Sequence, residues 1–302
     1  MKRTLVTVLS KLVVLGFAVS ASAAVPAIKV DCNKGGSVGA ALAHLTQTGN
    51  TRGVTIFVSG TCNENISISG FDHLVLKSLG QGTTLQDASN GSNTVVIVSS
   101  SYDVTLEGFI INGGGTGVWC GNGSLCRLNS NTIQQSVGSG VSGENSNLYL
   151  TGNNILNNAA FGVDAESGSN VVTSSNTISG NFRGFTIFAA SNLTASGDTV
   201  EQNSETGIVV VHKSFMRAVN VTINNNKADG VYIQSGSTAA FSGGNVITGN
   251  GINGVSVNDL SLAEFVGANT VTGNLITPDV GCFGQFPFAD GAATVGGTTN
   301  CK

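Results

Sequence analysis

Apolar and polar positions follow one short phrase that recurs seven times between residues 131 and 271. The phrase has Asn or Asp (Val221 in one copy), then one further residue, then Ile or Val, usually followed three residues later by Asn. Its aliphatic positions are Ile133, Ile155, Ile178, Val200, Ile223, Ile247 and Val271. They are separated by 22, 23, 22, 23, 24 and 24 residues, and a period of this size is typical of a stacked repeat architecture.

Each repeat contains three short runs, and the period-two alternation within them is typical of β-strands. Run A follows a glycine, run B follows a Ser or Asn turn, and run C is the recurring phrase itself. Run A begins at Val141, Val163, Phe185, Ile208, Val231 and Val255. Three strands in each 22–24-residue coil predict an all-β protein. We expect a single-stranded right-handed parallel β-helix of roughly nine coils over residues 51–275.

A leucine-rich repeat is the main alternative, because residues 148–155 fit its phrase and the period also fits. The other half of each repeat, however, carries a second β-branched strand, as in Val231-Tyr232-Ile233, where that fold places a helix. The iterated glycine-rich nonapeptides of the calcium-binding β-roll are missing. The β-helix is therefore favoured.

Asparagines occupy equivalent positions in successive coils. Stacked coils bring such positions about 4.8 Å apart, which lets side-chain amides form hydrogen-bonded ladders. One ladder is predicted three residues after the run C aliphatic positions, and comprises Asn158, Asn181, Asn203, Asn226, Asn250 and Asn274. A second is predicted for Asn131, Asn153, Asn176, Asn245 and Asn269.

The two ends of a β-helix need covers. Residues 37–45 are the one plausible helix, and we expect it to close the first coil as part of an N-terminal cap at 24–50. Residues 276–302 are expected to close the other end. Residues 1–23 have basic residues flanking an apolar run that ends in Ala21-Ser22-Ala23, and they predict a signal peptide.

Six cysteines fit an oxidising compartment. Their placement favours three local disulfides, Cys32 with Cys62, Cys120 with Cys126 and Cys282 with Cys301. Metal binding is the alternative, but no Cys-x-x-Cys motif or histidine cluster accompanies them, so no metal or other cofactor is expected.

Without its predicted signal peptide the chain has a negative net charge. The predicted signal peptide holds three of the 13 basic residues and none of the 17 acidic ones, which leaves a formal net charge of −7. A nucleic acid partner is therefore not expected. No other stretch approaches the roughly 20 apolar residues of a membrane span. We expect a secreted or periplasmic protein of unknown oligomeric state.

The Gly-Val, Ser-x-Asn-Leu and Asn-x-Ile-x-x-Asn phrases resemble the pectin-lyase-like superfamily of right-handed β-helices over most of residues 50–275. The resemblance implies a fold shared by lyases, hydrolases, epimerases, tailspikes and adhesins, so it does not supply one function. In many enzymes of this superfamily the polysaccharide lies along the face formed by run A and its loops. The same face is therefore the expected site.

The motifs of particular enzyme families are incomplete. Asp229-Gly230-Val231-Tyr232-Ile233 resembles part of one motif of the polygalacturonan hydrolases, whose other motifs are absent. The Trp-Ile-Asp-His phrase of pectate lyases is missing from every B run. Residues 161–166 resemble the Tyr-Gly-Phe-Asp-Pro-His motif of alginate epimerases, with Ala165 and Glu166 at the Pro and His positions.

Outward residues of run A form the candidate site, because inward residues of a strand alternate with outward ones. They combine aromatic side chains, which stack on sugar rings, with carboxylates that bind hydroxyl groups. The candidate catalytic residues are Glu144, Asp164 and Glu166. The candidate substrate-binding residues are Trp119, Arg183, Phe188, Lys213, Asp229 and Tyr232. Glu205 and His212 lie in the loops beside them.

Three functions fit these residues. The first is binding of a polysaccharide or cell-surface glycan along run A. The second is a polysaccharide lyase or glycoside hydrolase, because acids on neighbouring coils lie about 5 Å apart and acids two residues apart on one strand about 7 Å apart. The lyase would use Ca²⁺ on the three acids, with Arg183 or Lys213 as its base. The third is a structural or adhesive surface protein without a glycan site.

Overall fold

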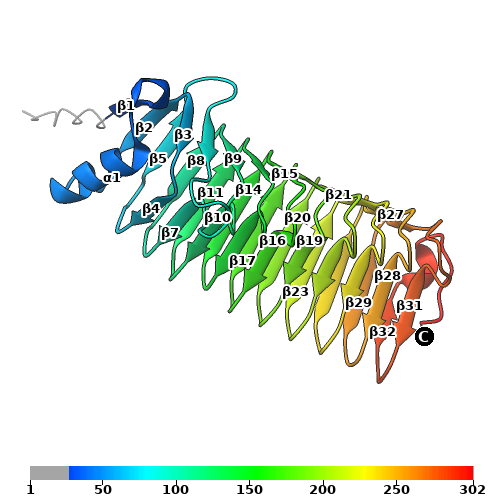
Figure 1. Ribbon diagram of the computed structural model, residues 1–302. Coiled ribbons are helices and arrows are strands. Elements are labelled where there is room, and N and C mark those ends of the chain that lie inside the picture. Colours follow the sequence, from blue (N-terminus) through cyan, green and yellow to red (C-terminus); the bar gives the residue numbers. More distant parts are fainter. Residues whose placement is uncertain (1–26, 302) are drawn as a thin grey trace, which may run out of the picture.

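The computed structural model describes residues 27–301, which form one elongated stack of coils (Figure 1). The signal peptide predicted for residues 1–23 lies outside the described residues. The chain passes through three strands in each coil and returns one layer further along, so three parallel sheets run the length of the molecule. The predicted right-handed parallel β-helix is confirmed.

Run A, run B and run C each form one sheet, here named sheets A, B and C. Sheet A has ten strands: β4 Ile66–Ser69, β7 Val96–Ser99, β10 Val118–Gly121, β13 Val141–Glu144, β16 Phe161–Glu166, β19 Arg183–Ile187, β22 Ile208–Val210, β25 Val231–Ile233, β28 Val255–Asn258 and β31 Val280–Phe283. Sheet C also has ten: β3 Thr61–Asn63, β6 Thr84–Gln86, β9 Ile110–Asn112, β12 Thr132–Gln134, β15 Asn154–Leu156, β18 Thr177–Ser179, β21 Thr199–Glu201, β24 Thr222–Asn224, β27 Val246–Thr248 and β30 Thr270–Val271.

Sheet B is longer than the other two. Its twelve strands are β1 Ala27–Asp31, β2 Thr55–Ser59, β5 Val75–Ser78, β8 Val104–Glu107, β11 Leu125–Asn129, β14 Asn147–Thr151, β17 Asn170–Ser174, β20 Asn192–Ser196, β23 Phe215–Val219, β26 Thr238–Ser242, β29 Leu262–Val266 and β32 Phe288–Asp290. The stack makes about ten turns, one more than the sequence period predicted. The first coils, between residues 55 and 112, lack the recurring phrase, so the sequence period does not define their number.

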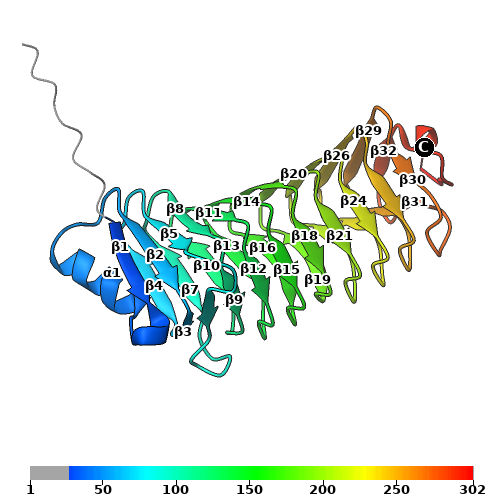
Figure 2. The same ribbon diagram turned by 90° about the horizontal axis from the view of Figure 1, so that it is seen from above.

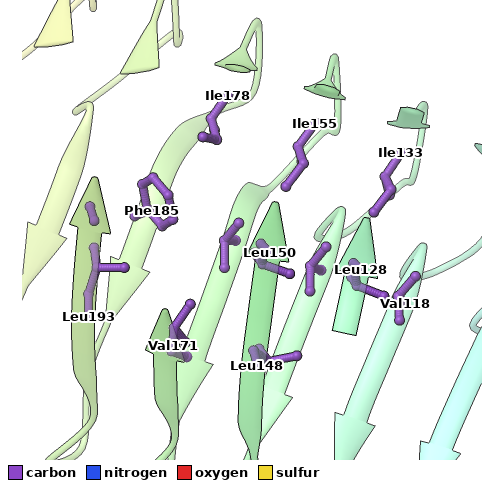
Figure 3. Close-up of a cluster of buried hydrophobic side chains, with 14 of the residues drawn as sticks. Val118, Leu128, Ile133, Leu148, Leu150, Ile155, Val171, Ile178, Phe185 and Leu193 are labelled. Carbon is purple, nitrogen blue, oxygen red and sulfur yellow. The ribbon is translucent and has the colours of Figure 1, made fainter. Parts of the chain in front are cut away.

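The core is a column of aliphatic side chains. Every coil places its run C aliphatic residue inward, and Ile133, Ile155 and Ile178 lie one above another without solvent exposure (Figure 3). Inward residues of sheets A and B close the column from the other sides. The glycine before each run A strand leaves room for this packing. At Gly162, for example, a Cβ would lie 2.5 Å from Cγ2 of Ile178 and 2.7 Å from the Gly184 carbonyl.

Both predicted asparagine ladders are present, and each is buried. In the longer one, the amide nitrogen Nδ2 of Asn181 donates to Oδ1 of Asn203 at 3.2 Å, and that of Asn203 donates to Oδ1 of Asn226 at 2.8 Å. Asp279 ends this ladder by accepting from Asn274 at 3.0 Å. The second ladder runs from Asn131 to Asp198 and is interrupted where Val221 replaces the asparagine.

A helix covers the N-terminal end, as predicted. Helix α1 spans Val38–Gln47 and lies across the first coils (Figure 2). Ser37 caps it by accepting from the Ala40 amide at 3.0 Å, and Glu64 accepts from the Val38 and Gly39 amides at 2.7 and 3.0 Å. Val38, Leu42 and Leu45 are buried against the coils.

Solenoid strands also occur in both segments expected to be caps. β1 pairs with β2 in parallel, and β31 and β32 pair with β28 and β29. Two 3₁₀ turns, Cys32–Lys34 and Ala292–Thr294, complete the ends. The three disulfides are those that the sequence predicted, Cys32–Cys62, Cys120–Cys126 and Cys282–Cys301. The described part of the chain holds no helix with the length and apolar character of a bilayer crossing.

Candidate functional site

The outer face of sheet A carries two rows of side chains that run across the strands. Row 1 comprises Trp119, Ser142, Asp164, Thr186, Val209, Tyr232 and Ser256, which are consecutive partners in the strand register. Row 2 comprises Gly121, Glu144, Glu166, Phe188, Val211, Gln234 and Asn258. Neighbours within a row lie about 4.8 Å apart, because each belongs to the next coil.

Row 1 is less exposed than its outward direction predicted. Ser142, Thr186, Val209 and Ser256 are only 8, 7, 5 and 3% exposed. The sequence period identifies the face on which a side chain stands, but it does not show how closely the loop from run C to run A folds beside that face. Over β19, β22 and β25, the loop residues Thr206, Ala228 and Ile252 stand beside row 1 and border a groove.

The groove deepens into a pocket of about 430 Å³ over β19, β22 and β25. Tyr232, Val209 and Val211 form its floor, and Arg183 and Glu205 form part of its wall. Thr206, Ala228, Asp229, His212, Gln234 and Ile252 complete the lining. The pocket thus brings together three of the predicted substrate-binding residues, Arg183, Asp229 and Tyr232.

Arg183 is held in place on three sides. Its Nε donates to Oε2 of Glu205, one coil further along, in an ion pair. Its guanidinium also lies 5.9 Å from the ring centre of Phe161 and 5.6 Å from that of Phe182. The pocket wall therefore offers a fixed guanidinium whose charge Glu205 compensates.

Asp229 supports the pocket from within the protein. Its side chain is 8% exposed, and Oδ1 accepts from Oγ of Ser256 at 2.7 Å and from the Asn253 amide at 3.0 Å. Burial raises its pKa, these hydrogen bonds oppose the rise, and the charge of Glu205 adds to it. Asp229 was predicted to bind substrate, and the structure shows that it lines the pocket while its carboxylate also holds the next loop.

Tyr232 presents its side chain on the pocket floor and is partly exposed. Burial raises the pKa of its phenol, and the charges of Asp229 and Asp259 raise it further. The phenol therefore remains protonated at neutral pH, where it can donate a hydrogen bond while its ring offers a stacking surface.

The three candidate catalytic acids lie together on β13 and β16, beside the pocket. Glu144 and Glu166 are register partners, and Asp164 stands on the same face as Glu166 two residues earlier. Burial and the charge of Glu166 raise the pKa of Asp164 to about 7. Burial and the charge of Glu144 raise that of Glu166. Asp164 is thus a carboxylic acid that is partly protonated near neutral pH.

A preformed metal site is not built from these acids. Within residues 27–301, the one group of three or more His, Cys, Asp or Glu side chains whose ligand atoms lie within 4.8 Å of one another is Cys32, Cys62 and Glu64. Its two cysteines form a disulfide. Glu144, Asp164 and Glu166 would need to move together before they could share the Ca²⁺ considered for a lyase.

The remaining predicted residues lie outside the pocket. Trp119 is in row 1 on β10, and its indole lies over Gly121, where a Cβ would be 2.2 Å from Cζ2 and Cη2. The Phe188 ring meets His212 edge-on with 6.1 Å between ring centres. Lys213 is exposed in the turn after β22, with a left-handed backbone. None of Trp119, Phe188 and Lys213 lines the pocket, whereas His212, which the Phe188 ring contacts, does.

Some of the lining was not predicted from the sequence. Thr206, Ala228 and Ile252 enter from three successive loops and carry no distinctive motif. The pairing of Arg183 with Glu205 had a usable signal, since opposite charges stand 22 residues apart, which is one coil. Charges at the repeat spacing therefore predict ion pairs between coils.

The comparisons with known proteins agree with the fold. The profile of the family described as "Right handed beta helix region" matches residues 56–219, and the chain belongs to this family. Its structure shares the right-handed β-helix fold with an alginate lyase and a pectate lyase of known structure. None of the curated proteins compared with the sequence matches it.

Three solved structures illustrate the likeness. An alginate lyase from Paenibacillus sp. str. FPU-7 superposes with a TM-score of 0.62 at 14% identity, over 83% of this chain and 98% of that one. The A-module of the mannuronan C-5 epimerase AlgE6 from Azotobacter vinelandii has a TM-score of 0.60 at 15% identity, over 84% and 79%. Pectate lyase Pel9A has a TM-score of 0.59 at 11% identity, over 92% and 77%. At these identities the likeness shows the fold alone.

Proposed function

We propose that this protein is an exported β-helix protein that binds a polysaccharide along the outer face of sheet A. The observation that carries the proposal is the pocket of about 430 Å³ with Tyr232 on its floor and a fixed guanidinium in its wall. Concave sites with aromatic surfaces and a few positioned polar groups are typical of ligand binding. The solved structures that share the fold include proteins named as acting on alginate and pectate, which supports a glycan ligand.

The two rows favour a long ligand over a single sugar. Trp119 and Tyr232 both belong to row 1 but are separated by five strand-to-strand steps. At about 4.8 Å a step, that separation is about 24 Å. One chain lying along the groove can reach both side chains, whereas one sugar cannot.

A glycan-binding assay with matched variants tests the proposal. Replacing Trp119, Phe188 and Tyr232 by Ala should abolish retention of the glycan while leaving the melting temperature within a few degrees of wild type. The matched control is Tyr149→Ala, a half-exposed tyrosine on the outer face of sheet B. Retention by the triple variant would contradict the proposed site. Absence of binding by every form, wild type included, would favour a structural or adhesive role.

A second candidate function is cleavage of the polysaccharide on the same face. It is favoured by one observation, the carboxyl of Asp164 with its pKa of about 7 beside the more exposed Glu166. A carboxyl that keeps its proton near neutral pH can protonate a departing glycosidic oxygen, while a neighbouring carboxylate assists. Product formation by wild type and its loss in Asp164→Asn would support cleavage. Unchanged polysaccharide after prolonged incubation, with and without Ca²⁺, would leave binding as the function.

A further inference from the structure

Two carboxylates of row 2, those of Glu144 and Glu166, lie between the aromatic side chains of Trp119 in row 1 and Phe188 in row 2. The indole of Trp119 covers Gly121, Gly121 is the register partner of Glu144, and Glu144 is the register partner of Glu166. Phe188 follows on the next coil, where its amide donates to the Ala165 carbonyl at 2.9 Å. From the indole to the Phe188 ring, this aromatic–acid–acid–aromatic segment spans three strand steps, about 14 Å.

The negative charge of this segment is not compensated by the protein. In the described chain, basic side chains pair with Asp31, Asp72, Asp103, Glu107 and Glu205. Glu144, Asp164 and Glu166 pair with no Lys, Arg or His of residues 27–301. Arg183, the cation in the pocket wall, is already bound to Glu205. Glu144 and Glu166 therefore present carboxylates on this face that no basic side chain of the described residues compensates.

Two side-chain oxygens beside these acids also lack hydrogen-bond partners among the described residues. Thr186 is 7% exposed, and its Oγ1 has no hydrogen-bond partner among the described residues. It is the register partner of Asp164, whose Oδ1 likewise has no partner there. Buried polar groups are normally hydrogen-bonded, so two adjacent unsatisfied groups single out this part of the face from the rest of the repeat.

We propose that the segment of sheet A from β10 to β19 binds a glycan that bears primary amino groups. This inference rests on the proposed polysaccharide-binding function and specifies its substrate class. An ammonium group donates up to three hydrogen bonds, which suits Glu144 and Glu166, and it is attracted to the aromatic faces of Trp119 and Phe188. A polyuronate chain would instead place its carboxylates against those of Glu144 and Glu166, and such juxtaposition opposes binding.

The test uses two oligosaccharides that differ only at the amine, namely glucosamine oligomers and their N-acetylated counterparts, with oligogalacturonate as the anionic comparison. Binding is measured by titration calorimetry on the disulfide-intact protein at about pH 6, where amino groups of this kind carry a proton. The glucosamine oligomer should bind at least about tenfold more tightly than the N-acetylated oligomer, because its ammonium groups form charge-assisted hydrogen bonds with the carboxylates.

The Glu144→Gln/Glu166→Gln variant is expected to lose that preference. Glutamine keeps the shape of the side chain and removes like charges, so the fold should be retained. The control is Glu264→Gln, an exposed acid on sheet B, which should bind as wild type does. Equal binding of the two glucosamine forms, or tighter binding of oligogalacturonate with or without Ca²⁺, would overturn the amine inference and uphold glycan binding. Failure of all glycans to bind would overturn the proposed function itself.

Discussion

Asp164 on β16 stands directly opposite Thr186 on β19, and within residues 27–301 neither Oδ1 of the acid nor Oγ1 of the threonine has a hydrogen-bond partner. The carboxyl is partly buried, and its pKa is raised to about 7. Keeping such a group charged destabilises the fold. The Asp164–Thr186 pair therefore lowers the free energy of unfolding without any need of the repeat for such a pair. Destabilising groups of this kind are typical of functional positions.

Replacement of Asp164 by Asn should stabilise the protein at alkaline pH. The folded pKa of about 7 lies above the ordinary value of about 3.9, so between these values the folded state binds more protons than the unfolded one. The free energy of unfolding of wild type therefore falls as pH rises from about 4 to 7. Asn does not titrate, and we expect the variant to be more stable by roughly 2–4 kcal/mol at about pH 8.

Urea unfolding at about pH 4 and pH 8 measures this effect. The difference between Asp164→Asn and wild type should nearly vanish at the lower pH, because both then carry an uncharged group. Asp290→Asn, an exposed change on β32, serves as the control and should differ from wild type by less than about 0.5 kcal/mol at both values. A stability difference that does not change with pH would contradict the assignment.

Removal of one asparagine from the longer ladder should destabilise the stack. The amide of Asn203 donates to Asn226 and to the Ile178 carbonyl, and its oxygen accepts from Asn181. Asn203→Ala leaves buried groups of both neighbouring coils unsatisfied, at a cost of about 2–4 kcal/mol in the free energy of unfolding. Asn154→Ala, at an exposed position of β15, is the matched control and should cost under about 0.5 kcal/mol. Equal losses in chemical denaturation would mean that the ladder adds nothing.

The position of the indole of Trp119 depends on Gly121. A methyl group at residue 121 would lie 2.2 Å from two carbons of the indole, so Gly121→Ala should push the ring off the strand and into water. Trp119 is the single tryptophan of the chain, and its emission should shift to longer wavelength in the variant. Gly80→Ala, where a Cβ would meet nothing within 4 Å, should leave the emission spectrum unchanged. An unshifted spectrum in Gly121→Ala would contradict the described ring position.

Loss of one aromatic side chain near the end of the stack should act locally. The rings of Phe241 and Phe265 stack at 4.7 Å between centres on β26 and β29. Phe241→Ala should cost about 3–5 kcal/mol. Because each coil contacts only its neighbours, amide hydrogen exchange should accelerate around β26 and β29 while the amides of β11 remain protected. Uniform acceleration along the chain would instead indicate a single cooperative unit.

Most of the fold could be predicted from the repeat spacing in the sequence. Residues such as Ile133 and Ile155 predicted the coil, the three sheets and both ladders, because stacking places equivalent residues in contact. The face of Glu144 and Asp164 was predictable for the same reason. The burial of Thr186 was not, since it depends on how far a loop without a motif folds over the sheet. The use of Asp229 as a loop support depends on Ser256, which is 27 residues away and has no marked pattern.

The regular stacking also fixes the distances along the groove in whole steps. A coil of 22–24 residues can be inserted or deleted with both ladders continuing across the junction, since each coil bonds to its neighbours through the same positions. Such a change would move Trp119 toward or away from Tyr232 by about 4.8 Å and leave each side chain in its own setting. The spacing between aromatic side chains on this face is therefore adjustable in evolution in steps of one coil.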